Sequence, residues 1–303
     1  MSKFDDLIKE KIELIDRSPE RFHTRVEAAQ SALWRAIESD FAKLETKDGK
    51  VVQSRKNLAT INRIVSTMQA VMSAGEYAEA VKSFLADFDQ AAKLTNSIAA
   101  TIDKGVQPNE FSKELQQFYR ESAIRQLFSN PINDTAEALR SDMISSIAAG
   151  SSLDDAIKSA RLVVEGSPDT NGRMLANVKT VASTALSVSD AGYSAAINAQ
   201  AGFEWYRYTG GEIDTTRPFC EVRNGKYFHK KEIQAWGRGD NAGGVGGIGK
   251  DGTWAGQIEG TTESSIFAFR GGWNCRHQLI PVSISRVPQD VIKRNEMNGN
   301  YKP

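Results

Sequence analysis

Apolar residues in the first 200 positions recur at the three- and four-residue spacing of an amphipathic α-helix. One stripe runs from Val26 to Leu44 and predicts a helix that stops at the turn signalled by Asp48-Gly49. Two further stripes predict helices over residues 58–72 and 77–102. Such stripes usually bury the core of a helical bundle, although some could face a partner subunit.

A fourth helix is expected to start after Asn109. Its apolar positions predict that Phe111, Leu115 and Phe118 are buried. It should end near Pro131, because proline disfavours the helical conformation of the residue before it.

Three more helices complete the first 200 residues. They are predicted near 134–149, over 152–165 and over 172–200. Gly150 should end the first of them, and Ser152 should cap the second.

The pattern changes after residue 202 to one that is typical of strands. An aromatic alternation predicts a strand over 203–208, and residues 278–282 predict a closing strand. Asn224-Gly225 indicates a hairpin turn between strands at 219–222 and 226–228.

Composition changes at the same place, since only seven of the 24 glycines precede residue 201. We therefore predict an α+β protein, with a long N-terminal helical arm or bundle and a small C-terminal α+β module that carries a β-hairpin and a Gly-rich loop. The expected domains are 1–130 for docking, 131–202 as a helical part, and 203–303 as the module.

The 303 residues carry 38 basic and 38 acidic side chains. This balance argues against a chain that coats nucleic acid or an anionic membrane. No apolar run reaches the length of a membrane span, and the charged segment 1–16 lacks the core of a signal peptide. We expect a cytoplasmic protein whose two cysteines are reduced thiols or metal ligands.

A glycine-rich run at 244–251 fits seven of the eight positions of a phosphate-binding loop. The eighth position, which must be Ser or Thr, is Asp251. Neither a strand before the run nor a helix after it is expected, so we interpret residues 237–260 as a flexible loop that could become ordered on contact with a partner.

Cys220, His229, Cys275 and His277 are the candidate metal ligands. Thiolate and imidazole donors suit a structural zinc ion, although the spacing is irregular and no Cys-x-x-Cys pair occurs. Buried or hydrogen-bonded Cys and His side chains are an alternative. A third interpretation is a thiol hydrolase, in which a cysteine is the nucleophile and His277 its base.

Asp214, Arg217 and Arg276 are the remaining polar candidates. Asp214 and Arg217 lie three residues apart before Pro218, so an ion pair between them should hold this loop in place. Basic residues nearby could instead contact DNA phosphates; they are at positions 217, 223, 226, 230, 231 and 238.

Several motifs follow one another in a specific order from Asp214 to Val282. They are the turn Asp214, Arg217, Pro218 and Cys220, the hairpin Asn224-Gly225-Lys226, the run Asn274-Cys275-Arg276-His277, and the ending Pro281-Val282. This order resembles the C-terminal domain of phage head morphogenesis proteins, the Mu protein F-like minor head proteins. The resemblance extends over residues 135–285.

This chain departs from the family pattern at two places. Family members with four ligand-like positions carry Cys where this chain has Arg217, so His229 would have to be the fourth ligand. The common His-Pro before Asn-Cys-Arg is Gly272-Trp273 here.

The resemblance implies a non-catalytic, low-copy protein of a tailed-phage head. It would be assembled in the host cytoplasm and reside in the virion, at the portal vertex or in the head interior. Its partners would be the portal, capsid or scaffolding protein, and it would act in head assembly, DNA packaging or genome ejection. The residues leave two alternatives, a Cys/His metal-dependent nuclease or hydrolase and an ejection protein that contacts packaged DNA.

Overall fold

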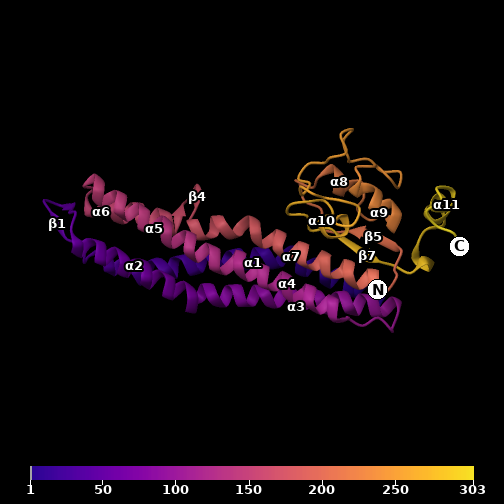
Figure 1. Ribbon diagram of the computed structural model, residues 1–303, viewed down its shortest axis with the longest axis horizontal. Coiled ribbons are helices and arrows are strands. Elements are labelled where there is room, and N and C mark those ends of the chain that lie inside the picture. Colours follow the sequence, from indigo (N-terminus) through magenta and orange to yellow (C-terminus); the bar gives the residue numbers. More distant parts are fainter. Residues whose placement is uncertain (1) are drawn as a thin grey trace. The chain divides into compact units, whose positions relative to one another are not determined.

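The computed structural model describes residues 2–303, apart from the side chain of Thr180. Long helices precede a small C-terminal antiparallel sheet (Figure 1), which confirms the predicted α+β class with its helical arm. The helices are α1 (Lys3–Phe41), α2 (Arg55–Ala74), α3 (Glu76–Ile102), α4 (Glu110–Ile124), α5 (Asn130–Ala149), α6 (Leu153–Val164), α7 (Arg173–Gln200), α8 (Pro218–Glu221), α9 (Lys230–Gly237), α10 (Ile266–Phe269) and α11 (Gln289–Met297).

The strands are β1 (Thr46–Lys47), β2 (Lys50–Val51), β3 (Gly166–Ser167), β4 (Thr170–Asn171), β5 (Trp205–Thr209), β6 (Tyr227–His229) and β7 (Gln278–Pro281). The first four form two small hairpins, and the last three form one sheet in the order β6-β5-β7. Among the described residues, no helix combines the length and the apolar character that a membrane crossing requires.

Helices α2, α3, α6 and α7 confirm the predictions from apolar periodicity. The expected caps are present as well: the Ser152 hydroxyl accepts from the Asp155 amide, and Gly150 ends α5 in the left-handed conformation. Helix α1 begins earlier than its predicted stripe and contains Pro19.

The predicted helix end near Pro131 was wrong, because a π-helical turn (Arg125–Ser129) joins α4 to α5 and the chain stays helical through the proline. Proline lacks the amide hydrogen that would bond to the carbonyl of Leu127, four residues earlier. The Tyr77 hydroxyl donates to that carbonyl instead. A tertiary hydrogen bond thus replaces the one that proline removes.

The predicted burial of the α4 stripe was also wrong. Phe111 and Phe118 are 62% and 57% exposed, and Leu115 is half-buried. Helix α4 buries Ser112 instead, and at its partly exposed edge the Arg120 guanidinium donates to the Asp89 carboxylate at 2.9 Å. Periodicity located the helix but assigned the wrong face to the core.

The predicted strand at residues 219–222 was wrong, since this segment is the short helix α8. Pro218 occupies its first turn, where a proline amide needs no partner. The Asn224-Gly225 turn does form, with Gly225 at φ +76°, and it leads into β6. Strand β6 pairs with β5, and so does the predicted closing strand β7.

The chain divides into two compact units. One consists of 2–18, Asp87–Arg120 and Ser183–Pro303, and the other of Pro19–Ala86 and Glu121–Ala182. In the second unit, α5 packs against α2 and α6. The boundaries expected from sequence after residues 130 and 202 remain predictions.

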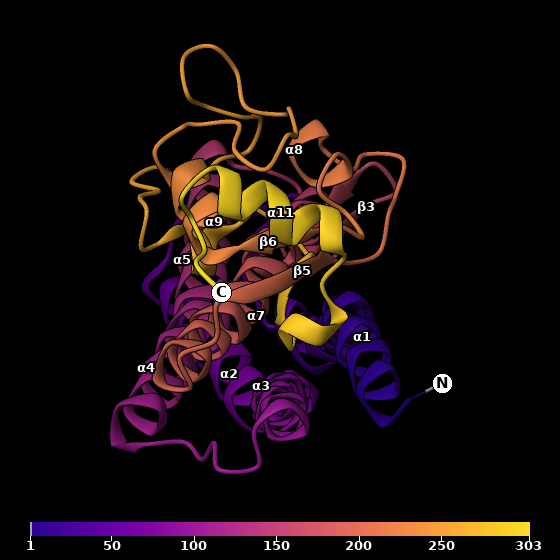
Figure 2. The ribbon, with the colours of Figure 1, turned by 90° about the vertical axis from the view of Figure 1, so that its right-hand side faces the viewer.

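The three-stranded sheet belongs to the first unit and has two differently covered faces (Figure 2). Tyr206, Tyr208 and Leu279 point into an aromatic cluster with Trp236 of α9. The alternate residues point the other way, into a core formed with α1, α3 and α11; they include Trp205, Ile280 and Val282.

Candidate functional site

Short elements of the C-terminal module position three of the four predicted ligands. Cys220 lies on α8, while Cys275 and His277 directly precede β7. The turn before Cys275 requires unusual backbone angles, with Gly272 at φ +96° and Asn274 at φ +57°. Asn tolerates this left-handed conformation better than most residues, and Gly adopts it without strain.

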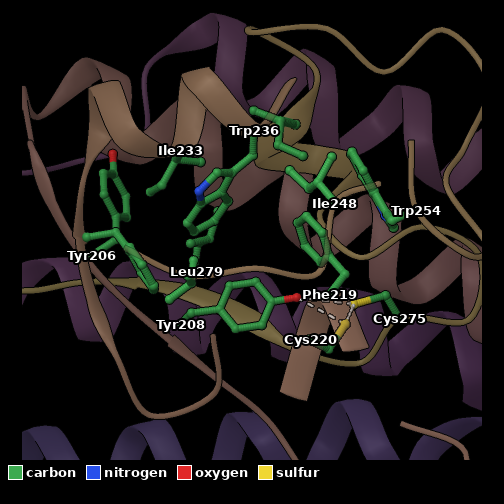
Figure 3. Packing of buried hydrophobic residues seen from close by; sticks show 13 residues of the cluster. Tyr206, Tyr208, Phe219, Cys220, Ile233, Trp236, Ile248, Trp254, Cys275 and Leu279 are labelled. Carbon is green, nitrogen blue, oxygen red and sulfur yellow. Dashed lines mark hydrogen bonds between the residues drawn. The ribbon is translucent and has the colours of Figure 1, made fainter. Parts of the chain in front are cut away.

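Cys220, Cys275 and His277 form a compact, fully buried cluster. One ligand atom from each side chain lies within 4.8 Å of the other two. The two sulfur atoms are 3.8 Å apart, and the Tyr208 hydroxyl lies 3.3 Å from the sulfur of Cys220 (Figure 3). The ring of Tyr208 also stacks on that of His277, with centroids 5.3 Å apart.

Gly271 covers the two sulfur atoms. A Cβ atom at this position would lie 2.3 Å from the sulfur of Cys220 and 2.9 Å from that of Cys275. No side chain fits there. The backbone of Gly271 therefore closes the cluster, and its carbonyl accepts a hydrogen bond from Arg217.

The hydrogen bond between the thiols separates their pKa values. It raises the pKa of Cys220, to which burial also contributes, and it lowers that of Cys275, an effect that neighbouring His277 strengthens against burial. Burial raises the pKa of Tyr208 well above its ordinary value. Of the two thiols, Cys275 is accordingly the one with the lower pKa.

The donor set fits a metal ion. His277 leaves Nε2 buried without a hydrogen-bond partner among the described residues. A buried ring nitrogen without a partner is costly unless something else binds it. Two thiols and an imidazole are ligands that zinc prefers, so this group could hold a metal ion.

His229 does not join the other three, which corrects the four-ligand prediction. It pairs with Trp205 at the start of β5, whereas Tyr208, beside the sulfur atoms, is three residues further along the strand. Three residues of a strand span about 10 Å and reverse the face. His229 instead caps α9, where Nδ1 accepts from the amide of Lys231.

Arg217 does not pair with Asp214, contrary to prediction. Its guanidinium donates to the carbonyls of Gly271 and Trp273, at 3.3 and 2.6 Å, and Asp214 is exposed. The side chain of Asn224 holds the loop instead, through hydrogen bonds to Gly210.

Asn224 exchanges hydrogen bonds with the backbone of Gly210, and the amide of Gly225 donates to the carbonyl of Tyr208 at 2.8 Å. The two remaining motif residues reach out to helices. Asn274 bonds to Thr184 of α7, and Arg276 donates to the carbonyl of Asp16 in α1. The motif thus fixes the module as a structural unit.

Arg223 cannot contact DNA phosphates, because its side chain is completely buried. It stacks between Phe219 and Trp236, with its guanidinium carbon 3.9 and 4.5 Å from the two ring centroids. It also donates to the carbonyls of Phe219 and Gly246. Burial lowers its pKa to about 10, and cation–π contacts compensate part of the lost hydration.

The segment expected to be a flexible loop contains no helix or strand between residues 238 and 265. It nevertheless folds onto the aromatic cluster (Figure 3): Val245, Ile248 and Trp254 are buried, and Trp254 stacks on Phe219 at 4.4 Å. Reciprocal hydrogen bonds join Asn241 to Ile248. The segment therefore covers the core next to the cysteines.

Sequence reasoning missed a second buried polar cluster in the same unit. The Lys11 ammonium lies 2.9 Å from the Asp190 carboxylate and donates to the hydroxyls of Thr95 and Ser194. Burial lowers the pKa of Lys11, while Asp190 opposes this shift. The four residues lie on three different helices, α1, α3 and α7, so the sequence carries no signal that they meet.

Sequence reasoning also missed Arg270, which is buried beside the cysteines. It donates to the Gln278 side chain at 2.7 Å and to the carbonyl of Ser187 at 2.6 Å. The Ser187 hydroxyl in turn donates to the carbonyl of Cys275. Through Ser187, helix α7 is thereby bonded to Arg270, just before Gly271, and to Cys275, just after the turn.

Comparison of the chain with models of protein families, with curated proteins and with solved structures found no match.

Proposed function

We propose that this protein is a non-catalytic minor head protein of a tailed bacteriophage. In this role it binds at the portal vertex or in the head interior and acts in head assembly, DNA packaging or genome ejection. The proposal rests on one observation: the residues on which the family resemblance is based lie close together in the fold and hold the module together. Arg217, Asn224 and Asn274 tie their loops to backbone or helix, and Cys220 meets Cys275.

The burial of the Cys/His cluster favours a structural role over a catalytic one. All three side chains are buried, and the backbone of Gly271 lies against both sulfur atoms. Catalytic zinc sites keep one position open to water or substrate, whereas structural sites are closed. A nuclease or thiol hydrolase would need its ligands or nucleophile within reach of a large substrate.

Zinc is the metal we propose for the cluster. Cys220, Cys275 and His277 supply three of the four ligands of a tetrahedral site, and the Tyr208 hydroxyl is a further oxygen atom beside both sulfur atoms. Bound zinc would join α8 to the segment before β7. It would thereby stabilise the module without taking part in chemistry.

Metal analysis of the purified chain after dialysis against zinc tests this site. We expect about one zinc ion per chain in the wild type and none in Cys275→Ser. His229→Asn is the matched control, since it alters the predicted ligand that lies on the other face of the sheet, and it should retain zinc. Zinc-free wild-type protein, or zinc loss in His229→Asn alone, would contradict the assignment.

The exposed stripe on α4 supplies a docking surface for the proposed role. Phe111, Leu115 and Phe118 follow the i, i+4, i+7 spacing with which one helix binds another. Glu110 and Glu114 lie along one edge of the stripe, and the Lys113 ammonium neutralises the first of them at 2.8 Å.

The occupant we infer is an apolar helix with a basic edge on the portal, capsid or scaffolding protein. A second copy of this chain fits less well, because antiparallel pairing of two α4 stripes would bring the Glu114 side chains toward each other. Charge complementarity therefore favours a different protein as the partner.

Quantitative mass spectrometry of virions and procapsids tests the head assignment. We expect this protein at a few copies per portal ring, and a strong loss of incorporation in Phe111→Ser/Phe118→Ser. Leu162→Ser, which alters another exposed apolar side chain on α6, is the control and should incorporate normally. Absence of the wild type from both particles would overturn the head assignment, and normal incorporation of the double variant would overturn the docking surface alone.

A further inference from the structure

We propose that Cys220 and Cys275 are an oxidisable dithiol, which a hydroperoxide converts to an intramolecular disulfide when no metal holds the sulfur atoms. This modification site does not depend on the proposed function. It uses the same two sulfur atoms as the zinc site, so metal binding and oxidation are alternative states of one cluster.

The geometry places the two sulfur atoms in a reactive pair. They are 3.8 Å apart and already share a hydrogen bond. A disulfide bond is about 2 Å long, so the two side chains must approach by a little under 2 Å. Cys220 is the third residue of the four-residue helix α8, and Cys275 lies in an irregular turn, so neither is fixed within a long helix or strand.

The oxidation proceeds in two balanced steps. One sulfur atom attacks the peroxide oxygen, the O–O bond breaks, and a sulfenic acid forms with release of water, which takes the thiol proton. The other sulfur atom then attacks the sulfenic sulfur, the S–O bond breaks, and a second water leaves with the remaining proton. Two thiols and one hydrogen peroxide thus give one disulfide and two water molecules.

The surroundings of the two sulfur atoms favour an internal disulfide over a disulfide to another molecule. Both sulfur atoms are buried, so a thiol of another molecule is excluded from them. The second cysteine is the nearest nucleophile to any sulfenic acid that forms. They are also the two cysteines of the chain, so no other internal thiol competes.

The disulfide would restrain the segment that folds over the aromatic cluster. Cys220 and Cys275 are 55 residues apart, and the chain between them includes the irregular region 238–265. Closing a loop of this length restricts the unfolded chain and raises resistance to denaturation. Oxidation should therefore shift the urea midpoint of the metal-free chain upward.

The test uses the full-length wild-type chain, stripped of metal and reduced. It is exposed to equimolar hydrogen peroxide, denatured, treated with iodoacetamide and weighed intact. We expect a monomer that has lost two hydrogen atoms and takes up no alkyl group. Reduction before alkylation should restore two alkyl groups.

Cys275→Ser is the matched variant, and it should retain a single thiol that either takes up one alkyl group or gains oxygen. The wild-type measurement stands alone should this variant fail to fold. Two alkylated thiols after peroxide, added oxygen in place of the disulfide, or a disulfide-linked dimer would each overturn the proposal.

Discussion

Two buried polar clusters in the same compact unit show different ways of placing polar groups inside a protein. Lys11 and Asp190 form a buried ion pair between helices. Cys220, Cys275 and His277 form a group of two thiols and an imidazole, and among the described residues Nε2 of His277 has no hydrogen-bond partner. The first cluster holds two opposite charges that neutralise each other, whereas the second holds thiol and imidazole groups that zinc prefers as ligands.

This difference indicates which of the two clusters is the better candidate for a functional site. A buried ion pair tolerates no change of either partner, because the remaining charge is left in a medium of low polarity. A buried Cys/His group can exist in several states, including thiol, metal-bound and disulfide. Chemistry is therefore expected in the second cluster, and structural rigidity in the first.

The largest effect is expected from Lys11→Met. It leaves the Asp190 carboxylate buried without its counter-ion, which should lower the free energy of unfolding by about 3–5 kcal/mol. Urea denaturation measures this loss. The double variant Lys11→Met/Asp190→Leu should regain most of it, and a loss below about 1 kcal/mol in the single variant would show that the two groups do not form a buried ion pair.

Gly271→Ala should have an intermediate effect on the other cluster. The added methyl group overlaps the sulfur of Cys220, and such overpacking lowers the free energy of unfolding by about 1–3 kcal/mol. Zinc uptake should fall with it. Gly246→Ala is the control, because a Cβ atom there meets nothing within 4 Å; equal losses in the two variants would argue against a specific closure of the cluster by Gly271.

The smallest effect concerns His229, a third buried polar group. Burial lowers its pKa, while Glu204 opposes the shift and the Lys230 and Lys231 ammonium groups add to it. The unfolded chain therefore binds a proton at His229 near pH 6.5, whereas the folded chain binds it only at a lower pH. Stability should fall as the pH decreases below about 6.5, by no more than about 1.4 kcal/mol per pH unit.

His229→Asn retains an acceptor for the cap of α9 but does not titrate. Urea midpoints at about pH 7.5 and pH 5.5 should therefore differ less in this variant than in the wild type. The same acid dependence in both chains would assign the effect to other groups.

The sequence predicted the helices well where a long apolar stripe met a cap or a turn, as in α2, α3 and α6. It failed where distant residues changed the local outcome. The Tyr77 hydroxyl allows the helix to continue through Pro131, and the Asp89 carboxylate of α3 pairs with Arg120 of α4. Neither partner can be identified from local spacing.

Amino-acid order by itself determined the fold class, most helices and strands β5 and β7. It also identified Cys220, Cys275 and His277 as candidate metal ligands. Helical and strand periodicity, caps and turns act over a few residues, so they are visible in the chain. Tertiary structure alone decided that His229 lies on the other face of the sheet, that Gly271 closes the sulfur pair, and that Lys11 meets Asp190. Strand register and helix packing set these distances, and both arise from contacts between residues far apart in the sequence.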